Sequence, residues 1–224
     1  MTITTTIVNH DSVYALAAAN HTLYAARTSG LYRSHDTGTT WIDSLAVLQH
    51  PQPLTVTAVA VQGETIFAGA KGAVLCSHDA GDTWTIVGLS SPPPHVVALT
   101  ISPNFAEDGT VAAGTTNDGV FLSTDRGVSW IAWNFGLLDT HIFALAFSPS
   151  YKYDRTLIAG TESGIFISKN GGRGWNEVDF PIAAAPVISV AFSPNYSRDG
   201  VVFAGSESSG LFISHDKSVS WKLS

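Results

Sequence analysis

Residues 77–84 read Ser-His-Asp-Ala-Gly-Asp-Thr-Trp, and this pattern decides the fold because it occurs five times along the chain. The other copies occupy residues 34–41, 123–130, 168–175 and 214–221, so that the leading serines lie 43, 46, 45 and 46 residues apart. A period in the forties is typical of one four-stranded blade of a β-propeller. We call each eight-residue copy a turn motif, and we expect one blade for each.

The sequence between the turn motifs supports this interpretation. Short apolar segments recur in phase at residues 13–16, 56–59, 96–99, 142–145 and 187–190, and again at residues 23–26, 66–69, 111–114, 157–160 and 202–205. A third apolar segment runs into each turn motif, and a fourth strand is expected to leave it at the tryptophan. Strands that are apolar on both faces suit blades, because each blade is covered by a neighbour on either side.

The sequence therefore predicts an all-β chain that forms a single five-bladed β-propeller of four-stranded antiparallel blades. The expected blades span approximately residues 9–50, 51–92, 93–138, 139–183 and 184–224. Five repeats favour a closed ring, and the β-prone residues 1–8 are a candidate ring-closing strand that pairs with the last blade. The alternative is that the chain is an excerpt of a longer propeller.

The turn motif resembles the Asp box, or bacterial neuraminidase repeat, whose pattern is Ser-x-Asp-x-Gly-x-Thr-Trp. Sialidases, sortilin-type receptors, some xyloglucanases and a photosystem assembly factor carry it. The resemblance implies that the motifs are structural hairpin turns at the blade periphery. The expected structural residues are Asp36, Trp41, Asp79, Trp84, Asp125, Trp130, Asn170, Trp175, Asp216 and Trp221. The fourth copy has Asn170 and Gly174, and the fifth has Ser218 in place of glycine, so we expect distorted turns there.

Composition excludes several functional classes. The chain is 45% hydrophobic and 13% charged, which suits a packed sheet protein, and its formal charge of −7 with scattered basic residues argues against nucleic-acid binding. Its one cysteine, Cys76, cannot form an intramolecular disulfide. Residues 1–8 do not read as a signal peptide, and no apolar window is long enough for a membrane span. We expect a soluble cytoplasmic protein, unless an export signal precedes these residues, with no cofactor.

The candidate site is the mouth of the central channel. Each innermost strand begins there, and the loop between the second and third strands of each blade lies beside it. Aligned positions there differ from blade to blade, which a purely structural rim does not require. The candidate ligand-binding residues are Arg27, Lys71, His95, Asn117, Asp118, His141, Glu162 and Glu207. His95 and His141 occupy matching positions on adjacent blades, with His10 as a candidate third metal ligand. Two histidines without a clear third ligand are a weak metal signal, so no metal site is assigned.

Three further residues stand out. Arg33 replaces an apolar residue of the other repeats, and we expect it to be paired where the ring closes. Trp133 and Phe135 follow the third turn motif, where packing against the blade edge is favoured over an exposed aromatic platform.

The residues favour a binding or scaffold propeller, with a protein, peptide or glycan as partner, over an enzyme. A sialidase of this kind needs three substrate-gripping arginines and six blades, and no arginine here lies in the expected Arg-Ile-Pro segment. Another glycosidase needs two carboxylates that flank one bond. Glu162 and Glu207, on equivalent loops of adjacent blades, are the candidates for that alternative, and no catalytic residue is assigned.

A first prediction concerns stability. Replacing Trp84 by alanine should lower the free energy of unfolding by about 3–5 kcal/mol, because truncating a large packed aromatic leaves a cavity. Replacing His35, a surface position of a turn motif, should cost no more than about 0.5 kcal/mol. Denaturant titration of both variants measures this, and equal losses would contradict the structural role of the motif.

Overall fold

The computed structural model describes residues 11–49 and 53–224, and they form five separate sheets of four antiparallel strands each. The first blade comprises β1 (Val13–Ala19), β2 (Thr22–Arg27), β3 (Gly30–Ser34) and β4 (Ile42–Asp43), followed by the short helix η1 (Ala46–Leu48). The second comprises β5 (Val56–Gln62), β6 (Thr65–Ala70), β7 (Ala73–Ser77) and β8 (Thr85–Gly88). In both, strands pair in chain order, as in an up-and-down blade.

The last three blades share one addition, a four-residue helix between their first two strands. The third blade comprises β9 (Val96–Ile101), α1 (Phe105–Asp108), β10 (Val111–Thr115), β11 (Val120–Ser123) and β12 (Ile131–Ala132). The fourth comprises β13 (Ile142–Phe147), α2 (Tyr151–Asp154), β14 (Leu157–Thr161), β15 (Ile165–Ser168) and β16 (Asn176–Glu177). The fifth comprises η2 (Ile182–Ala184), β17 (Val187–Phe192), α3 (Tyr196–Asp199), β18 (Val202–Ser206), β19 (Gly210–Ser214) and β20 (Lys222–Leu223). The prediction of an all-β, five-bladed propeller is confirmed.

These helices belong to a second repeat that the sequence analysis missed. Each lies in a Ser-Pro-x-aromatic-x-x-Asp segment, at residues 102–108, 148–154 and 193–199. In each segment the serine hydroxyl donates to the aspartate Oδ2 at 2.6–2.7 Å, and this bond ties the short helix into a closed turn. The first two blades have a direct hairpin at this place instead.

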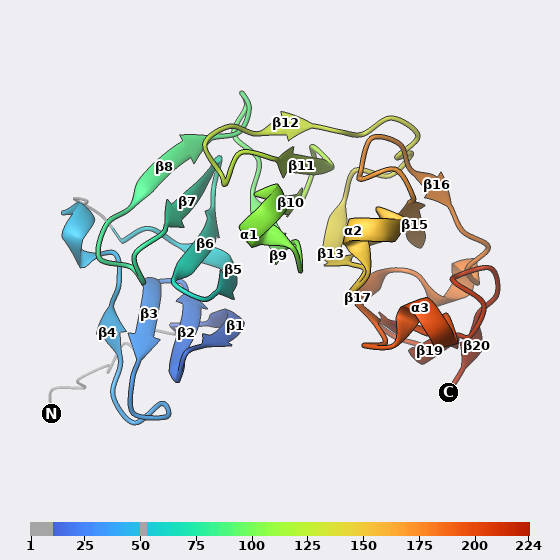
Figure 1. The fold of residues 1–224 in the computed structure, drawn as a ribbon, viewed down its shortest axis with the longest axis horizontal. Helices are drawn as coiled ribbons and strands as arrows, with labels where there is room; N and C mark the ends of the chain where they lie inside the picture. Colours follow the sequence, from blue (N-terminus) through green and yellow to red (C-terminus); the bar gives the residue numbers. More distant parts are fainter. Residues whose placement is uncertain (1–10, 50–52) are drawn as a thin grey trace, which may run out of the picture.

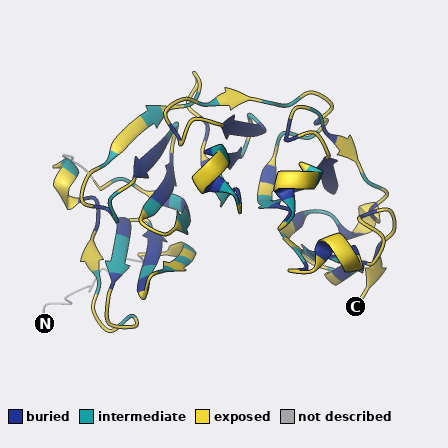
Figure 2. Ribbon diagram, in the orientation of Figure 1, coloured by how far each residue is buried: buried dark blue, intermediate teal, exposed yellow. Residues whose placement is uncertain are grey.

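The hydrophobic core is divided into four slabs, one between each pair of neighbouring blades. Successive residues of a strand enter different slabs: Ile66 packs toward the first blade, whereas Phe67 packs toward the third. Figure 2 shows the resulting burial: the middle strands of the blades are mostly buried, and the outermost strands and the helices are mostly exposed. The apolar-on-both-faces pattern of the sequence is the direct consequence of this stacking.

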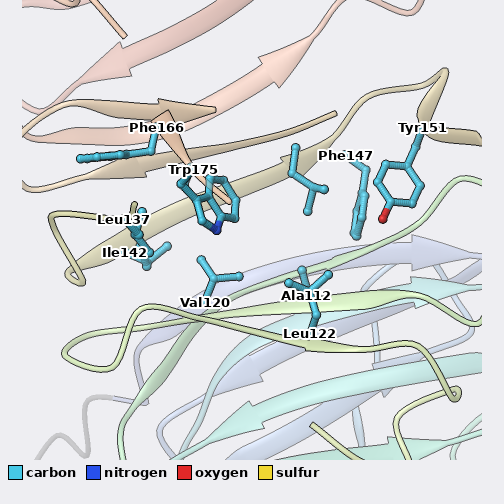
Figure 3. Close-up of a cluster of buried hydrophobic side chains, with 11 residues drawn as sticks. Ala112, Val120, Leu122, Leu137, Ile142, Phe147, Tyr151, Phe166 and Trp175 are labelled. Carbon is cyan, nitrogen blue, oxygen red and sulfur yellow. The ribbon is translucent and has the colours of Figure 1, made fainter. Parts of the chain in front are cut away.

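In the second to fifth blades, the tryptophan of the turn motif packs into the slab between its own blade and the preceding one. Trp175 lies among Val120, Leu137 and Ile142 in the slab between the third and fourth blades (Figure 3). Its indole Nε1 donates to the backbone oxygen of Trp133 in the third blade at 2.8 Å. The motif therefore joins blades as well as turning the chain.

The blades follow one another along an open arc (Figure 1). The innermost strands β1, β5, β9, β13 and β17 contact one another in that order, but no comparable contact joins the first and fifth blades among the described residues. The expectation of a closed five-bladed ring is therefore wrong for this part of the chain, because the packing between neighbouring blades leaves the first and fifth blades at the two ends of the arc (Figure 1). The candidate closing strand at residues 1–8 lies outside the described residues.

The turn motifs keep the same two bonds to the Oδ1 atom of their aspartate or asparagine in all five blades. In the second, Asp79 Oδ1 accepts from the Ser77 hydroxyl at 2.7 Å and the Thr83 N–H at 2.9 Å, and Asp79 Oδ2 accepts from the Thr83 hydroxyl at 2.5 Å. The expected distortion of the fourth and fifth copies is confined to local differences. Gly174 has no hydroxyl for the third bond, and in the fifth copy the Val219 N–H donates to Asp216 Oδ1 at 3.1 Å. Asn170 Oδ1 makes the first two bonds at 2.9 Å, and Ser218 adopts the positive φ, 69°, that the motif requires.

These bonds generate a pH prediction. They stabilise the ionised carboxylate and lower the pKa of Asp79 to about 2, with the Thr83 hydroxyl as the largest cause. A lowered folded-state pKa contributes stability that is present above the ordinary value of 3.8 and is lost as pH falls toward about 2. Denaturation midpoints of Asp79→Asn should therefore fall less steeply across this window than those of the wild type.

The matched control for this measurement is Asp179→Asn, at an exposed position outside the turn motifs. It should retain the acid sensitivity of the wild type. Parallel decline of the wild type and Asp79→Asn between pH 4 and pH 2 would show that the motif carboxylate carries no acid sensitivity.

Candidate functional site

The loops at the channel mouth are held by backbone hydrogen bonds to the starts of the inner strands. Thr28, Thr116, Glu162 and Glu207 donate their N–H groups to the carbonyl oxygens of Ser12, His95, His141 and Pro186, respectively, at 3.0–3.2 Å. In the second blade, Lys71 pairs instead with His95 of the third, as an isolated β-bridge. The backbone of the mouth is therefore held in one conformation by these hydrogen bonds, which also fixes the positions from which its side chains extend.

Most of the candidate side chains are exposed at this mouth: Lys71, His95, Asn117, His141, Glu162 and Glu207. Asp118 is half-buried, and its Oδ2 accepts from the Ser90 hydroxyl at 2.7 Å, which ties the loop after β8 to the third blade. Lys71, His95, Asn117 and Glu207 are exposed and available to a ligand, whereas Asp118 already has a structural partner.

His141 lies in a small polar cluster on the fourth blade. Its Nδ1 is 3.3 Å from Asp139 Oδ1 and 3.5 Å from Glu162 Oε2. Burial raises the pKa of Asp139, but hydrogen bonds, including those from the His141 and Ser163 N–H groups, outweigh it and leave the pKa below its ordinary value. Asp139 is therefore an ionised anchor for two backbone segments, which suits a fixed loop better than a general acid.

The geometry does not assemble a metal centre from these histidines. No group of three His, Cys, Asp or Glu side chains with metal-binding geometry occurs in residues 11–49 and 53–224. His10, the candidate third ligand, lies outside the described residues.

Arg27 does not project freely into the mouth, contrary to the expectation. Its guanidinium lies 4.8 Å from the Tyr32 ring centroid and 4.9 Å from that of Trp41, and it is 3.6 Å from Asp11 Oδ2. The cation covers the aromatic face of the first blade that no other blade in residues 11–49 and 53–224 contacts. Its cation–π contacts give it a structural role there.

Arg33 is paired, but at a different place from the one expected. Its Nη1 donates to the Ala80 carbonyl oxygen at 2.8 Å and lies 3.5 Å from Asp82 Oδ1, both in the turn motif of the second blade. It therefore links the first two blades and takes no part in ring closure.

The two aromatic residues after the third turn motif separate. Trp133 packs against the slab between the third and fourth blades, whereas the Phe135 side chain is 84% exposed. The favoured packing thus holds for Trp133 and fails for Phe135.

A collar of side chains, which alignment of the repeats does not single out, lies just inside the mouth. Every inner strand has an irregular register at one aligned residue, and these five residues are Tyr14, Thr57, Val97, Phe143 and Ile188. A β-bulge re-aims a side chain and is common beside binding sites. Phe143 is 40% exposed and Ile188 is 47% exposed, which is unusual for large apolar residues on the innermost strands.

The collar borders a hollow of about 240 Å³ on the concave side of the arc. All five inner strands contribute to its lining, among them Ala15, Val59 and Leu99 together with Val97, Phe143 and Ile188. Uncharged and mostly apolar side chains line this wall, while the charged candidates lie at its rim. The arrangement suits an apolar group that enters the hollow while its polar flanks contact the rim.

The described residues contain no helix that is long and apolar enough to span a membrane.

The model of the family described as DUF6242 beta propeller domain matches residues 2–224. No curated protein matches the chain.

Solved structures similar to this chain have diverse roles. Each is aligned here over 94–95% of this chain. A GH74 enzyme from Niastella koreensis has a TM-score of 0.73 at 19% identity, with 37% of its chain covered. YCF48 bound to D1 peptide has a TM-score of 0.69 at 17% identity, with 66% covered. The computationally designed Ika8 protein has a TM-score of 0.66 at 17% identity, with 60% covered. The chain thus spans between about a third and two thirds of these proteins, and the likeness shows the fold alone.

Proposed function

The chain belongs to the DUF6242 beta propeller domain family, and on this premise we propose that it is a non-enzymatic binding propeller that presents its channel mouth to a peptide or protein. The observation that carries the proposal is the pairing of an apolar collar with free polar side chains on a fixed backbone. Binding sites commonly combine an apolar hollow with a few placed polar groups.

The chemistry favours a peptide over a glycan as partner. Phe143 and Ile188 offer exposed apolar surface, and Lys71, Glu162 and Glu207 offer charges of both signs at the rim. A peptide with an apolar side chain between charged neighbours would contact both the apolar collar and the charged rim. YCF48, a structural neighbour, binds a D1 peptide on a similar fold, but at 17% identity no residue role is carried over.

The assignment of the blades to the Asp-box class is part of the same proposal. It is supported by the shared hydrogen bonds of the five turn motifs and by the inter-blade position of the tryptophans of the four later motifs. Within that class, a structural role for the motifs leaves the mouth as the place for function.

The alternative function is that of a glycoside hydrolase. It is supported by the structural likeness to GH74 enzymes and by the exposure of Glu162 and Glu207 on neighbouring blades. Replacement of either glutamate by glutamine should abolish hydrolysis if this alternative holds, whereas the binding proposal expects no turnover on a broad glycoside panel.

The binding proposal predicts a mutational pattern for peptides selected from a phage-displayed random library on the immobilised protein. Phe143→Ser should weaken the selected peptides by about tenfold or more, as for a buried anchor of an interface. Lys71→Ala should weaken them less, because the lysine lies at the solvated rim. Fluorescence anisotropy gives the affinities, and thermal melting checks that each variant is folded.

The matched control is Tyr153→Ser, since this tyrosine is exposed on α2 at the opposite end of the blades. It should leave peptide affinity unchanged. Loss of binding in Tyr153→Ser with full binding in Phe143→Ser would move the site away from the mouth, and failure to select any peptide would count against a peptide partner.

A further inference from the structure

The interface between neighbouring blades is built four times in the described chain from two kinds of surface. The following blade contributes a leading face, with its motif tryptophan and the first residue of its inner strand. Those first residues are Val56, Val96, Ile142 and Val187, each 0% exposed. The preceding blade contributes a receiving face, with an apolar residue of its third strand. Those residues are Leu31, Val74, Val120 and Ile165, none more than 1% exposed.

The first blade carries a leading face that no other blade contacts within the described part of the chain. Val13, which aligns with the four buried residues, is 51% exposed, and Leu16 beside it is also exposed. The Trp41 Nε1 donates to the Gly38 carbonyl oxygen of its own motif at 3.1 Å, whereas Trp84 also reaches the Ser44 carbonyl oxygen of the preceding blade at 2.9 Å.

The fifth blade carries a receiving face with no blade on it. Leu211, which aligns with Leu31 and its equivalents, is 45% exposed. A Cβ placed on Gly114 would meet Ile142 of the next blade at 2.5 Å, but one on Gly205 would meet only Ser189 of its own blade within 4 Å. The spot into which a neighbouring inner strand packs is thus uncovered.

The two free faces lie at the two ends of the open arc (Figure 1). Each is one half of an interface whose other half the same molecule holds at its opposite end. Every copy of the chain therefore carries a complementary pair of faces, and the described part does not satisfy the pair within itself.

We propose that these end faces bind a second copy of the chain, with the first blade of one molecule stacked on the fifth blade of another. The argument is continuity: the contact repeats the packing of a β-branched residue against glycine found at Gly69, Gly114 and Gly160, together with the tryptophan packing found between the blades inside each molecule. Such a contact joins two different surfaces, so it is heterologous and can continue beyond two copies. This association is independent of the ligand proposed for the mouth.

The test uses two charge substitutions that each block one end. Val13→Asp removes the leading face, and Leu211→Asp removes the receiving face. Each places an unpaired carboxylate in the contact, and should raise the dissociation constant by about a hundredfold or more. Val128→Asp, at an exposed turn-motif position away from both end faces, is the matched control.

Sedimentation velocity over a concentration series should show association of the wild type and of Val128→Asp, and monomers for each end variant alone. An equimolar mixture of Val13→Asp and Leu211→Asp should form a one-to-one dimer and nothing larger, because one intact leading face meets one intact receiving face. Thermal melting should show unchanged monomer stability, since both residues are exposed in the single chain.

Each other outcome overturns the proposal. A wild type that stays monomeric at all concentrations excludes the second copy. End variants that associate like the wild type place self-association elsewhere, and end variants that fail to complement each other in the mixture indicate a symmetric contact. A monomeric wild type with both end variants destabilised would mean that the two faces meet within one chain.

Discussion

The packing of one inner strand against a bare spot on the preceding blade is the constraint on which the rest of this structure depends. At Gly69 and Gly114 a Cβ would lie 2.5 Å from Val96 and Ile142, respectively, so glycine allows the neighbouring strand to approach. In the first blade Ala26 holds this position, in the slab that also contains Val56 of the second blade. Because this contact sets the distance between blades, it also aligns the motif tryptophan with its slab. The hydrophobic core is then a series of similar slabs, and protein interiors packed in this way tolerate little change of volume.

Two properties follow from that constraint, one for the mouth and one for the ends. The inner strands are held close together, so their bulged residues form a collar of fixed geometry beneath the loops of the mouth. The same repetition leaves one half-interface uncovered at each end of an arc that does not close. The collar at the mouth and the two complementary end faces thus both result from the repeated packing of blade against blade.

The sequence allowed the repeats, the number of blades and the structural role of the turn motifs to be predicted, because each depends on local spacing and residue type. Ring closure could not be predicted from the sequence, because the arrangement of neighbouring blades depends on side-chain packing across each slab and no residue pattern indicates it. The mouth residues were found by alignment of the repeats. Alignment did not reveal that Arg27 contacts Tyr32 and Trp41, because this contact lies on a face of the first blade that no other described blade covers. The bulges at Phe143 and Ile188 escaped notice because every copy has one, and so no repeat stood out. The Ser-Pro segments escaped notice because only three blades carry them.

The most direct test of this account compares Gly114→Ala with Gly205→Ala in dilute protein, where any association between copies is absent. Both glycines occupy the same position of the second strand. A Cβ on Gly114 would meet Ile142 of the following blade, whereas one on Gly205 would meet the Ser189 Oγ of its own blade at 2.3 Å, and this exposed hydroxyl can rotate away. The account predicts that Gly114→Ala lowers the free energy of unfolding by about 1–3 kcal/mol, as for overpacking, and that Gly205→Ala lowers it clearly less. Equal losses at the two positions would contradict the claim that close approach between blades governs the fold.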